Sequence, residues 1–403
     1  MLKDNRKIFG LQRNVFFLGI VSLFNDFSAE MVYSVMPAFL TVVLGAPPVF
    51  LGFMEGFVDA LASLLKIFSG WLSDKMGSRK WFAVWGYALS VATRSLLAFV
   101  TGLGQVFSLR VVDRLGKGLR DAPRDALLSE SVDSHELGKS FGYHRAMDTV
   151  GAILGPLSAI IFLPMLAYNY RNLFLLSFII GILAVIAFIF VREAKTKEEI
   201  KPKRSVPFSF SLKNFEPKFK LYLSAVFIFG MGVMPVSLML LKVKDLGLDG
   251  LATPLLYLVY TITFALCAIP MGKFADKFGE QKILMIGFFI AILGYLVLAF
   301  TNTILLTVMG FIIFGLYSAM TDGVERAFAT KLVPREQLAQ GQGFLQSAVG
   351  LSSLVGGSLG GLIWTYYGSS FAFFYGAAMM VAGLLFFMML NGLNKHRDAE
   401  VYN

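Results

Sequence analysis

Ionisable side chains lie inside stretches of this sequence that are otherwise apolar. Asp26 and Glu30 belong to the apolar stretch 15–44, and Arg114 belongs to the stretch 105–128. A charge in membrane hydrocarbon costs several kcal/mol unless it is paired or hydrated, so such residues are candidates for function. Acids beside movable bases can bind and release protons, which is the chemistry these residue types favour.

Asp26, Glu30 and Arg114 form the first candidate group, for proton coupling. Residues four apart share a helix face, and a rise of about 1.5 Å per residue brings Asp26 level with Arg114 and Glu30 level with Arg110. An ion pair favours the charged carboxylate, whereas separation in an apolar cavity favours the neutral acid. We therefore predict a proton switch here. The alternative is a static ion pair that fixes one helix on another.

Asp59, in the stretch 50–71, is a second candidate carboxylate for proton coupling. A depth estimate places it near the middle of a span, level with Arg94 of the stretch 81–102. Pairing of Asp59 with Arg94 or with an asparagine is an equal alternative. The remaining polar side chains of these stretches are candidate substrate contacts: Asn25, Arg94, Arg110, Asp113 and Lys117.

The second half of the chain offers apolar, aromatic and amide groups instead. Its candidate substrate contacts are Met231, Met234, Tyr257, Tyr260 and Gln346. Thioether groups can bind a soft metal such as Cu(I), but methionines serve more often as flexible packing, and we predict no metal site. A cavity with one charged wall, from the first half of the chain, and one aromatic wall, from the second half, suits an amphipathic or polar organic solute.

A further set of charged and small residues gathers near the cytoplasmic ends of the predicted helices, where we expect a gate. The set comprises Gly70, Asp74, Gly77, Arg79, Asp121, Arg124, Arg145, Asp148, Asp276, Asp322, Glu325 and Arg326. Such a belt would hold one state of the protein and separate in the other.

The composition requires elements that cross a membrane. Apolar residues make up 56% and charged residues 15% of 403 residues, against roughly a quarter charged in soluble domains. Segments of about 20 apolar residues number twelve, at 15–44, 50–71, 81–102, 105–128, 139–163, 172–191, 219–241, 251–272, 281–300, 303–328, 337–365 and 369–392.

Lysine and arginine are distributed unevenly between the connecting segments. Alternate connections are rich in them, whereas the others carry only Arg171, Lys242 and Lys244. Basic segments stay in the cytoplasm, so both termini are predicted to be cytoplasmic. The net charge of +10 is then a topology signal and an attraction to anionic lipid, and we predict no nucleic-acid partner.

The two halves of the chain repeat each other. Gly70-Trp71-Leu72-Ser73-Asp74-Lys75-Met76-Gly77-Ser78-Arg79-Lys80 returns as Gly272-Lys273-Phe274-Ala275-Asp276-Lys277-Phe278-Gly279. Both copies join apolar segments. In the same register Asp121 corresponds to Asp322, and the pair Arg124-Asp125 corresponds to Glu325-Arg326.

These loops resemble the hallmark loop of the major facilitator superfamily, which that family also repeats in its second half. The resemblance implies an all-α membrane protein of 12 transmembrane helices in two pseudo-symmetric six-helix bundles. The expected domains are an N-terminal bundle at 1–191, a basic cytoplasmic linker at 192–218 and a C-terminal bundle at 219–403. The substrate cavity would lie between the bundles near the midplane.

Two further motifs resemble those of the superfamily. Arg114-Leu115-Gly116-Lys117-Gly118 is similar to its helix-four motif, whose arginine is tied to proton coupling, although Lys117 and Arg120 depart from the usual pattern. Gly151-Ala152-Ile153-Leu154-Gly155-Pro156 is similar to the start of the antiporter motif, and its trailing glycines are absent. Independently of the family, G-x-x-x-G packs helices closely.

Secondary transport fits these observations best, and no enzyme motif is present: Gly116-Lys117-Gly118 lacks the spacing of a phosphate loop. We predict a proton-coupled exporter of an amphipathic compound, with an importer of a polar or anionic metabolite or metal chelate as the alternative. The expected partners are protons, a small-molecule substrate and the lipid bilayer. We expect no cofactor beyond the proton gradient, a monomer, and the cytoplasmic membrane of a prokaryote as location.

Overall fold

The computed structural model describes residues 7–76, 79–133, 136–193, 212–248, 250–334 and 337–401, and it describes side chains outside 66–76, 214, 339 and 391–401. Three predicted gate positions are affected. Gly77 lies outside the described residues. Gly70 and Asp74 belong to a described helix, but the side chain of Asp74 lies outside the description.

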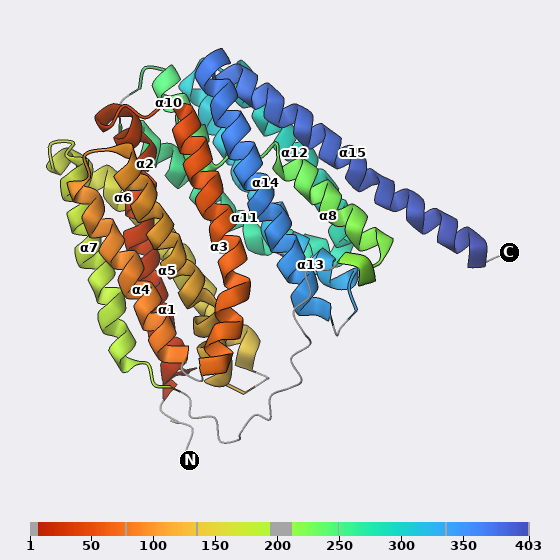
Figure 1. Cartoon of the computed structure of the whole chain (residues 1–403), viewed down its shortest axis with the longest axis horizontal. Coiled ribbons are helices and arrows are strands. Elements are labelled where there is room, and N and C mark those ends of the chain that lie inside the picture. The colour runs from red at the N-terminus through yellow and green to blue at the C-terminus, as the bar shows by residue number, and fades with distance from the viewer. Residues whose placement is uncertain are drawn as a thin grey trace. The chain divides into compact units, whose positions relative to one another are not determined.

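The first half of the chain forms a short hairpin followed by long helices (Figure 1). Its elements are β1 (Lys7–Ile8), β2 (Leu11–Gln12), α1 (Arg13–Tyr33), α2 (Met36–Ala38), a π-helical turn (Phe39–Val43), α3 (Pro48–Met76), α4 (Arg79–Leu96), α5 (Leu103–Glu130), α6 (Leu137–Met165) and α7 (Tyr170–Ala187), with 3-10 turns at Leu97–Phe99 and Phe188–Phe190.

The second half is also helical. Its elements are a 3-10 turn (Leu212–Asn214), α8 (Pro217–Gly230), α9 (Val236–Met239), α10 (Lys242–Asp245), α11 (Ala252–Phe278), α12 (Glu280–Phe300), α13 (Ile304–Lys331), α14 (Leu338–Tyr367) and α15 (Ser369–Val401).

Ten helical stretches in the described part of the chain are long and apolar enough to cross a membrane. Two predicted spans are not among them. α5 is a continuous helix of 28 residues, but its many charges take it out of the apolar class. The predicted span 219–241 is wrong as a single helix, because the chain leaves α8 after Gly230 and restarts at α9. The total of twelve spans stays a prediction.

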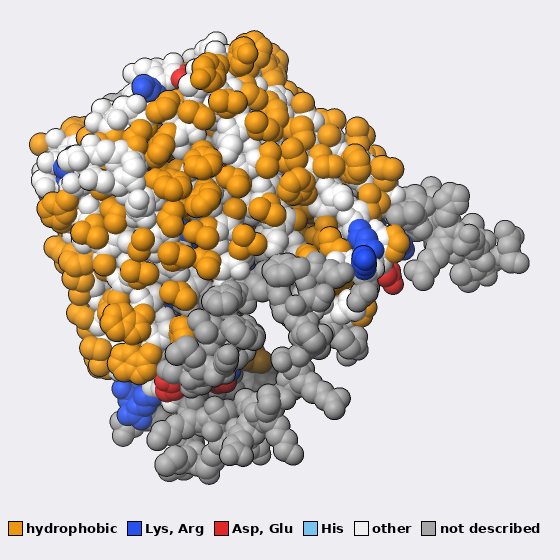
Figure 2. All heavy atoms as spheres, viewed as in Figure 1, with side chains coloured by type: hydrophobic (Ala, Val, Ile, Leu, Met, Phe, Trp, Pro, Cys, Tyr) orange, Lys and Arg blue, Asp and Glu red, His pale blue; other side chains and the backbone are white. Residues whose placement is uncertain are grey.

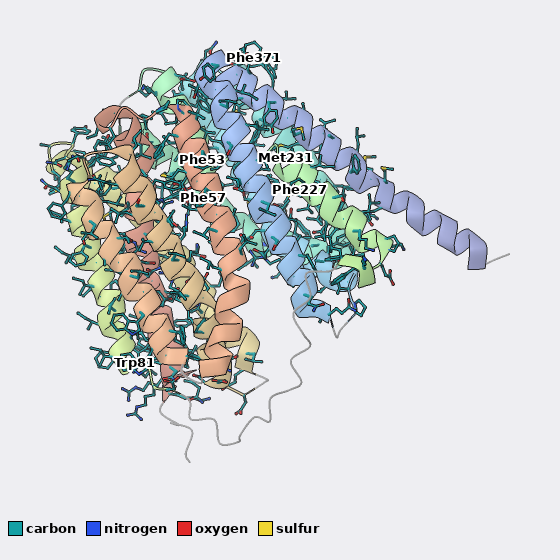
Figure 3. The ribbon with its side chains drawn as sticks, viewed as in Figure 1. Phe53, Phe57, Trp81, Phe227, Met231 and Phe371 are labelled. Carbon is teal, nitrogen blue, oxygen red and sulfur yellow. The ribbon has the colours of Figure 1, made fainter. Side chains whose placement is uncertain are left out.

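The break after α8 has a local cause. Proline has no backbone N–H and clashes with the preceding helical turn, and Pro235 stands immediately before α9 with an extended ψ of 140°. Figure 3 shows Phe227 and Met231 at the end of α8, just before this break.

Contacts divide the chain into two compact units, residues 1–45 with 61–206 and residues 46–60 with 207–403. In the first unit α1 packs on α6 and α7, and α4 packs on α5. In the second unit α8 and α12 pack on α15, and α11 and α12 pack on α13. The domain limits predicted from the sequence, with a linker at 192–218, stay a prediction; residues 194–211 of that linker lie outside the described residues.

Glycines let α6 approach α1 closely. A Cβ on Gly151 would lie 2.5 Å from the main-chain oxygen of Leu23, and one on Gly155 would lie 2.6 Å from the main-chain nitrogen of Met31. Real Cβ atoms do not come this near to other atoms, so only glycine fits. The close packing predicted from G-x-x-x-G is confirmed, and it places the acids of α1 against α6.

The outer surface is apolar, as a lipid-facing surface must be. Hydrophobic side chains cover most of the face in Figure 2, and the visible acidic and basic groups lie toward its margins. Trp85, Leu266 and Phe300 are among the large apolar side chains that are about 70% exposed. Trp81, at the first turn of α4 (Figure 3), is also exposed. Aromatic rings at such positions anchor helices at the membrane–water interface.

Candidate functional site

Asn25, on α1, joins three helices of the first unit through hydrogen bonds. Its side-chain Oδ1 accepts from Nη2 of Arg94 on α4 (3.0 Å) and from Nη1 of Arg120 on α5 (3.1 Å). Its main-chain oxygen accepts from Arg94 Nη1 (3.2 Å). The exposed fractions are 1% for Asn25, 4% for Arg94 and 5% for Arg120. Two guanidinium groups therefore share one neutral oxygen in a buried place. We call Asn25, Asp26, Arg94 and Arg120 the Asn25 cluster.

The two arginines have additional partners that fix their positions. Arg94 Nη1 also donates to Oγ of Ser28, which lies one turn after Asn25 on α1 (3.0 Å). The guanidinium carbon of Arg120 lies 4.4 Å from the centre of the Tyr87 ring, a cation–π contact. Arg120 Nε lies 3.6 Å from an oxygen of Asp121. Arg94 is thus held by neutral groups, and Arg120 by a neutral, an aromatic and an acidic group.

Asp26 connects the cluster to a second acid. Its Oδ1 accepts from Asn25 Nδ2 at 2.8 Å. The charge of Asp148, on α6, repels that of Asp26, while Arg120 and Lys117 attract it. Asp148 accepts a hydrogen bond from Ser22 of α1. Two carboxyl groups on packed helices are therefore balanced by bases on α5.

The structure adds an arginine that the depth estimate from the sequence did not include, and the predicted pairing of Asp26 with Arg114 stays a prediction. Arg120, between one and two turns further along α5 than the predicted Arg114, donates to Asn25, and its charge attracts that of Asp26. Arg110 forms an ion pair with Asp113 on its own helix (3.6 Å) and lies over the ring of Tyr33.

Asp113 and Lys117 also contribute to the polar region around the cluster. The charge of Asp113 interacts most strongly with Arg94, then with Arg114 and Arg110. The main-chain oxygen of Asp113 accepts from Ser90 Oγ at 3.1 Å.

Asp59, the second predicted carboxylate for proton coupling, lies half-buried on α3, within the second unit. The hydrogen bonds of the Arg94 guanidinium go to Asn25 and Ser28.

The predicted gate residues of the first unit form ion pairs near the ends of α5 and α6. Arg124 pairs with Asp125 (2.8 Å) and lies 3.9 Å from Asp121. Arg145 lies 3.6 Å from Asp148. Both partners of each of these pairs lie on the same helix. The pairs therefore connect neighbouring turns of α5 or of α6.

A capping contact at the start of α4 was missed by the sequence reasoning. Glu193 Oε1 accepts from the main-chain N–H groups of Arg79 (2.6 Å) and Lys80 (3.2 Å). These N–H groups begin α4 and have no partner within the helix. The side chain of Arg79, a predicted gate residue, pairs with Glu130 at the end of α5. Nothing in the local sequence marks Glu193 as a cap, because it lies more than a hundred positions away.

The second unit carries an aromatic group where the sequence placed substrate contacts. Tyr257 and Tyr260 lie one turn apart on α11 with ring centres 6.0 Å apart. The hydroxyl of Tyr260 donates to Ser318 Oγ on α13 (3.2 Å). The ring of Tyr260 stacks on Phe314, also on α13 (5.8 Å). The predicted Gln346 lies half-buried on α14.

The predicted methionines lie around Tyr295 and Tyr375. The main-chain N–H of buried Met234 donates to the Tyr295 hydroxyl (2.7 Å), which in turn donates to the sulfur of Met239 (3.8 Å). The main-chain oxygen of Met231 accepts from Tyr375 (3.0 Å). Tyr295 therefore holds the main chain at Met234 and the side chain of Met239 in the second unit.

The remaining predicted gate residues lie at the surface of the second unit. Asp322 and Arg326 form a half-exposed pair one turn apart on α13 (2.6 Å). Asp276 is exposed on α11. Glu325 lies between the members of the pair in sequence but is half-buried.

Long apolar helices with a buried, ion-paired polar cluster define a multi-pass membrane protein. The sequence profile of the Major Facilitator Superfamily matches residues 18–259 and 221–401. The chain belongs to this superfamily and is a transporter, not an enzyme.

Two relatives and one solved structure are similar to the chain. An uncharacterized MFS-type transporter of Methanocaldococcus jannaschii is 31% identical over 95% of this chain and 96% of its own length. The multi-drug resistance efflux pump PmrA of Streptococcus pneumoniae is 26% identical over 88% and 90%. The crystal structure of the nucleoside transporter NupG aligns with a TM-score of 0.73 over 93% of this chain and 98% of that chain at 16% identity, which shows a shared fold.

Proposed function

We propose that the protein exports an amphipathic organic compound in exchange for protons, by alternating access. The observation that carries this proposal is the half-buried carboxyl of Asp26, which is hydrogen-bonded to Asn25 and feels the charges of a second acid, Asp148, and of Arg120. The similarity to a pneumococcal efflux pump supports the outward direction.

The Asn25 cluster suggests how a proton would act. Charge on both Asp26 and Asp148 is unfavourable at short range, and one proton relieves the repulsion. Once Asp26 is neutral, Arg120 loses an attraction on α1 and keeps Asp121 on its own helix. The tie between α1 and α5 then weakens. A proton thereby changes the relative free energies of two helix arrangements, which is what coupling requires.

The other residues keep the roles proposed from the sequence. Glu30, Arg114 and Asp59 would assist proton transfer. The substrate contacts would be Asn25, Arg94, Arg110, Asp113, Lys117, Met231, Met234, Tyr257, Tyr260 and Gln346. The gate would comprise Gly70, Asp74, Gly77, Arg79, Asp121, Arg124, Arg145, Asp148, Asp276, Asp322, Glu325 and Arg326.

Import of an anionic solute in symport with protons is the second candidate. It is favoured by the two guanidinium groups that meet at Asn25 Oδ1. An uncharged oxygen does not neutralise two arginines, and a carboxylate or phosphate group of a solute would do so more strongly. In either case we propose a monomer in the cytoplasmic membrane of a prokaryote, with both termini in the cytoplasm.

Proteoliposomes with an imposed pH gradient test the proposal. Ethidium serves as the probe because its permanent charge prevents passive redistribution with pH. An antiporter accumulates ethidium in the lumen when the lumen is acidic, and the accumulation collapses when an ionophore removes the gradient. Accumulation of ethidium that occurs only when the lumen is alkaline would favour symport. Tetracycline, a zwitterion, provides the same comparison for a second compound.

A further inference from the structure

The short β-hairpin that precedes α1 presents one large apolar ring. β1 and β2 pair in antiparallel register with Ile8 opposite Leu11, so Phe9 and Gly10 form the two-residue turn between the strands. Phe9 is 91% exposed, more than any other large apolar residue that the structure describes. The hairpin takes no part in the Asn25 cluster, so the exposed ring needs an explanation of its own.

The backbone of this turn does not favour phenylalanine. The φ angle is +49° at Phe9 and +75° at Gly10, and a two-residue hairpin turn with both angles positive usually carries Asn-Gly. Asparagine adopts this conformation readily, whereas a bulky residue with a positive φ is an outlier. Local folding therefore does not account for the ring of Phe9. An interaction outside the hairpin would account for it.

Two lysines attach the hairpin to the start of α6. Lys7 Nζ lies 3.0 Å from Glu136 Oε1. Lys139 Nζ donates to the main-chain oxygen of Gly10 at 3.0 Å. These contacts hold the main chain on both sides of Phe9 while its ring stays exposed. The ring is thus presented from a fixed position.

The Phe9 ring lies beside the first turn of a stretch that is long and apolar enough to span a membrane, Arg13–Val43. Its centre is 6.1 Å from that of Phe16, the fourth residue of α1. Phe16 in turn stacks on Tyr143 of α6 (6.3 Å). Phe16 and Tyr143 are half-buried in helices of the spanning class. An exposed ring at the end of such helices suits the boundary between lipid headgroups and acyl chains.

The charge beside the ring is positive. The side chain of Lys7 is 50% exposed although it pairs with Glu136. Lys139 is exposed, and within the described part of the chain no acid forms an ion pair with it; its ammonium group bonds to a neutral oxygen. A phosphate with a net negative charge would neutralise Lys139, and leaflets that face the cytoplasm, where this end of the chain is predicted to lie, are the ones that carry anionic lipid.

We propose that the hairpin binds an anionic phospholipid, with the Phe9 ring at the acyl boundary and the ammonium groups of Lys139 and Lys7 on the headgroup phosphate. This role goes beyond the proposed transport function and does not depend on the solute or the coupling ion. Because Lys139 belongs to the first turn of α6, a bound lipid would also bear on the helix that carries the predicted gate residues Arg145 and Asp148.

Thermal unfolding of the full chain in a nonionic detergent tests the binding. Added phosphatidylglycerol should raise the Tm of wild type more than the same amount of phosphatidylcholine, because a ligand of the folded state stabilises it. Phe9→Asn should fold at least as well as wild type without lipid, since asparagine suits the turn, but lose about half or more of the lipid-dependent rise. Lys139→Gln should lose a similar share. The matched control Lys213→Gln removes an exposed lysine of the second unit and should keep the whole rise.

Spin labelling in nanodiscs locates the ring position. The chain has one cysteine, Cys267, so Cys267→Ser provides a background for single labels. A nitroxide attached through Phe9→Cys should collide more with oxygen, which concentrates in lipid, than with a water-soluble nickel complex. A nitroxide attached through Asp133→Cys, at an exposed position between α5 and α6, should show the opposite preference.

Four results would overturn the proposal. One is a Phe9→Asn protein that keeps the whole lipid-dependent rise in Tm. Another is an equal rise with glycerol phosphate, which would assign the lysines to a soluble anion. The third is a Phe9 label that the nickel complex reaches as easily as the Asp133 label. The fourth is spin–spin broadening of the Phe9 label that grows with the protein-to-lipid ratio, which would place a second copy of the chain on the ring.

Discussion

At the scale of single residues, Asn25 connects several polar side chains of the first unit. One amide connects two buried arginines and one acid across three helices. Sequence inspection placed Asn25 among the substrate contacts, but it did not reveal that Arg94 and Arg120 would converge on it. Convergence depends on helix rotation and tilt, which an apolar pattern does not specify closely enough.

We predict that Asn25→Ala destabilises the protein by about 2–4 kcal/mol, because buried guanidinium donors lose their acceptor. Thermal unfolding in detergent, followed by intrinsic fluorescence, measures the change in Tm. Asn14→Ala is the matched control: Asn14 also joins distant segments, through Ser131 and Arg192, but near the surface. A smaller loss of Tm for Asn25→Ala than for Asn14→Ala would contradict this account.

Lys242, on α10 beyond the predicted seventh span, gives a pH-dependent prediction. Burial lowers the pKa of Lys242, and the charge of Asp245 opposes that shift. The ammonium group donates to Ser369 Oγ at 3.1 Å. Because the folded-state pKa is below the unfolded-state value, the unfolded chain binds more protons between the two values. Stability from this group therefore rises with pH across that interval.

The comparison of wild type with Lys242→Met isolates this contribution. The Tm of wild type relative to that of Lys242→Met should increase as pH rises from neutral toward about 10. Fluorescence-detected melting over a pH series in one detergent checks the trend. A relative Tm that falls with pH would show the opposite sign and refute the assignment.

At the scale of elements, glycine seams decide which helices can touch. The first part of α3 and the middle of α14 both belong to the second unit. A Cβ on Gly52 would lie 2.0 Å from the main-chain oxygen of Gly357, and one on Gly56 would lie 2.6 Å from that of Ser353. Phe53 and Phe57 lie on this part of α3 (Figure 3). Backbone meets backbone along the seam, so no side chain there can move aside.

Gly52→Ala should therefore cost about 1–3 kcal/mol of stability through overpacking. Gly323→Ala is the control, because a Cβ on this helical glycine of α13 meets nothing within 4 Å. The control should be neutral or stabilise by up to about 1 kcal/mol, as alanine favours helix over glycine. Equal Tm values for the two variants would argue against the seam.

The elements also show what sequence can and cannot predict. The hydrophobic pattern located the long helices because a membrane span needs many consecutive apolar residues. The pattern was wrong after α8, because Pro235 interrupts the helix although the apolar residues continue past it. It could not reveal the Glu193 cap on α4, because the contact joins residues that are distant in the chain. G-x-x-x-G in α6 was predictable, since its effect depends only on local spacing.

At the scale of the whole molecule, the chain is a transporter of the major facilitator superfamily. The paired loops at Gly70 and Gly272 predicted this from the sequence, because a repeated loop reflects a repeated bundle. The charges are distributed unequally between the units. The first unit concentrates ion pairs around Asn25, whereas the second buries several tyrosines and the acids Glu55 and Glu280. Family membership specifies neither the substrate nor the coupling ion, which depend on these side chains.

Transport by Asp26→Asn tests the central claim most directly, because the substitution keeps the size and hydrogen-bonding shape of Asp26 but cannot bind a coupling proton. Ethidium accumulation in proteoliposomes with an acidic lumen is measured beside exchange without a gradient, with Asp245→Asn, an exposed acid on α10, as the control. We predict that Asp26→Asn loses gradient-driven accumulation by about tenfold or more and retains exchange, while Asp245→Asn retains both. Accumulation by Asp26→Asn equal to that of wild type would contradict proton coupling through Asp26.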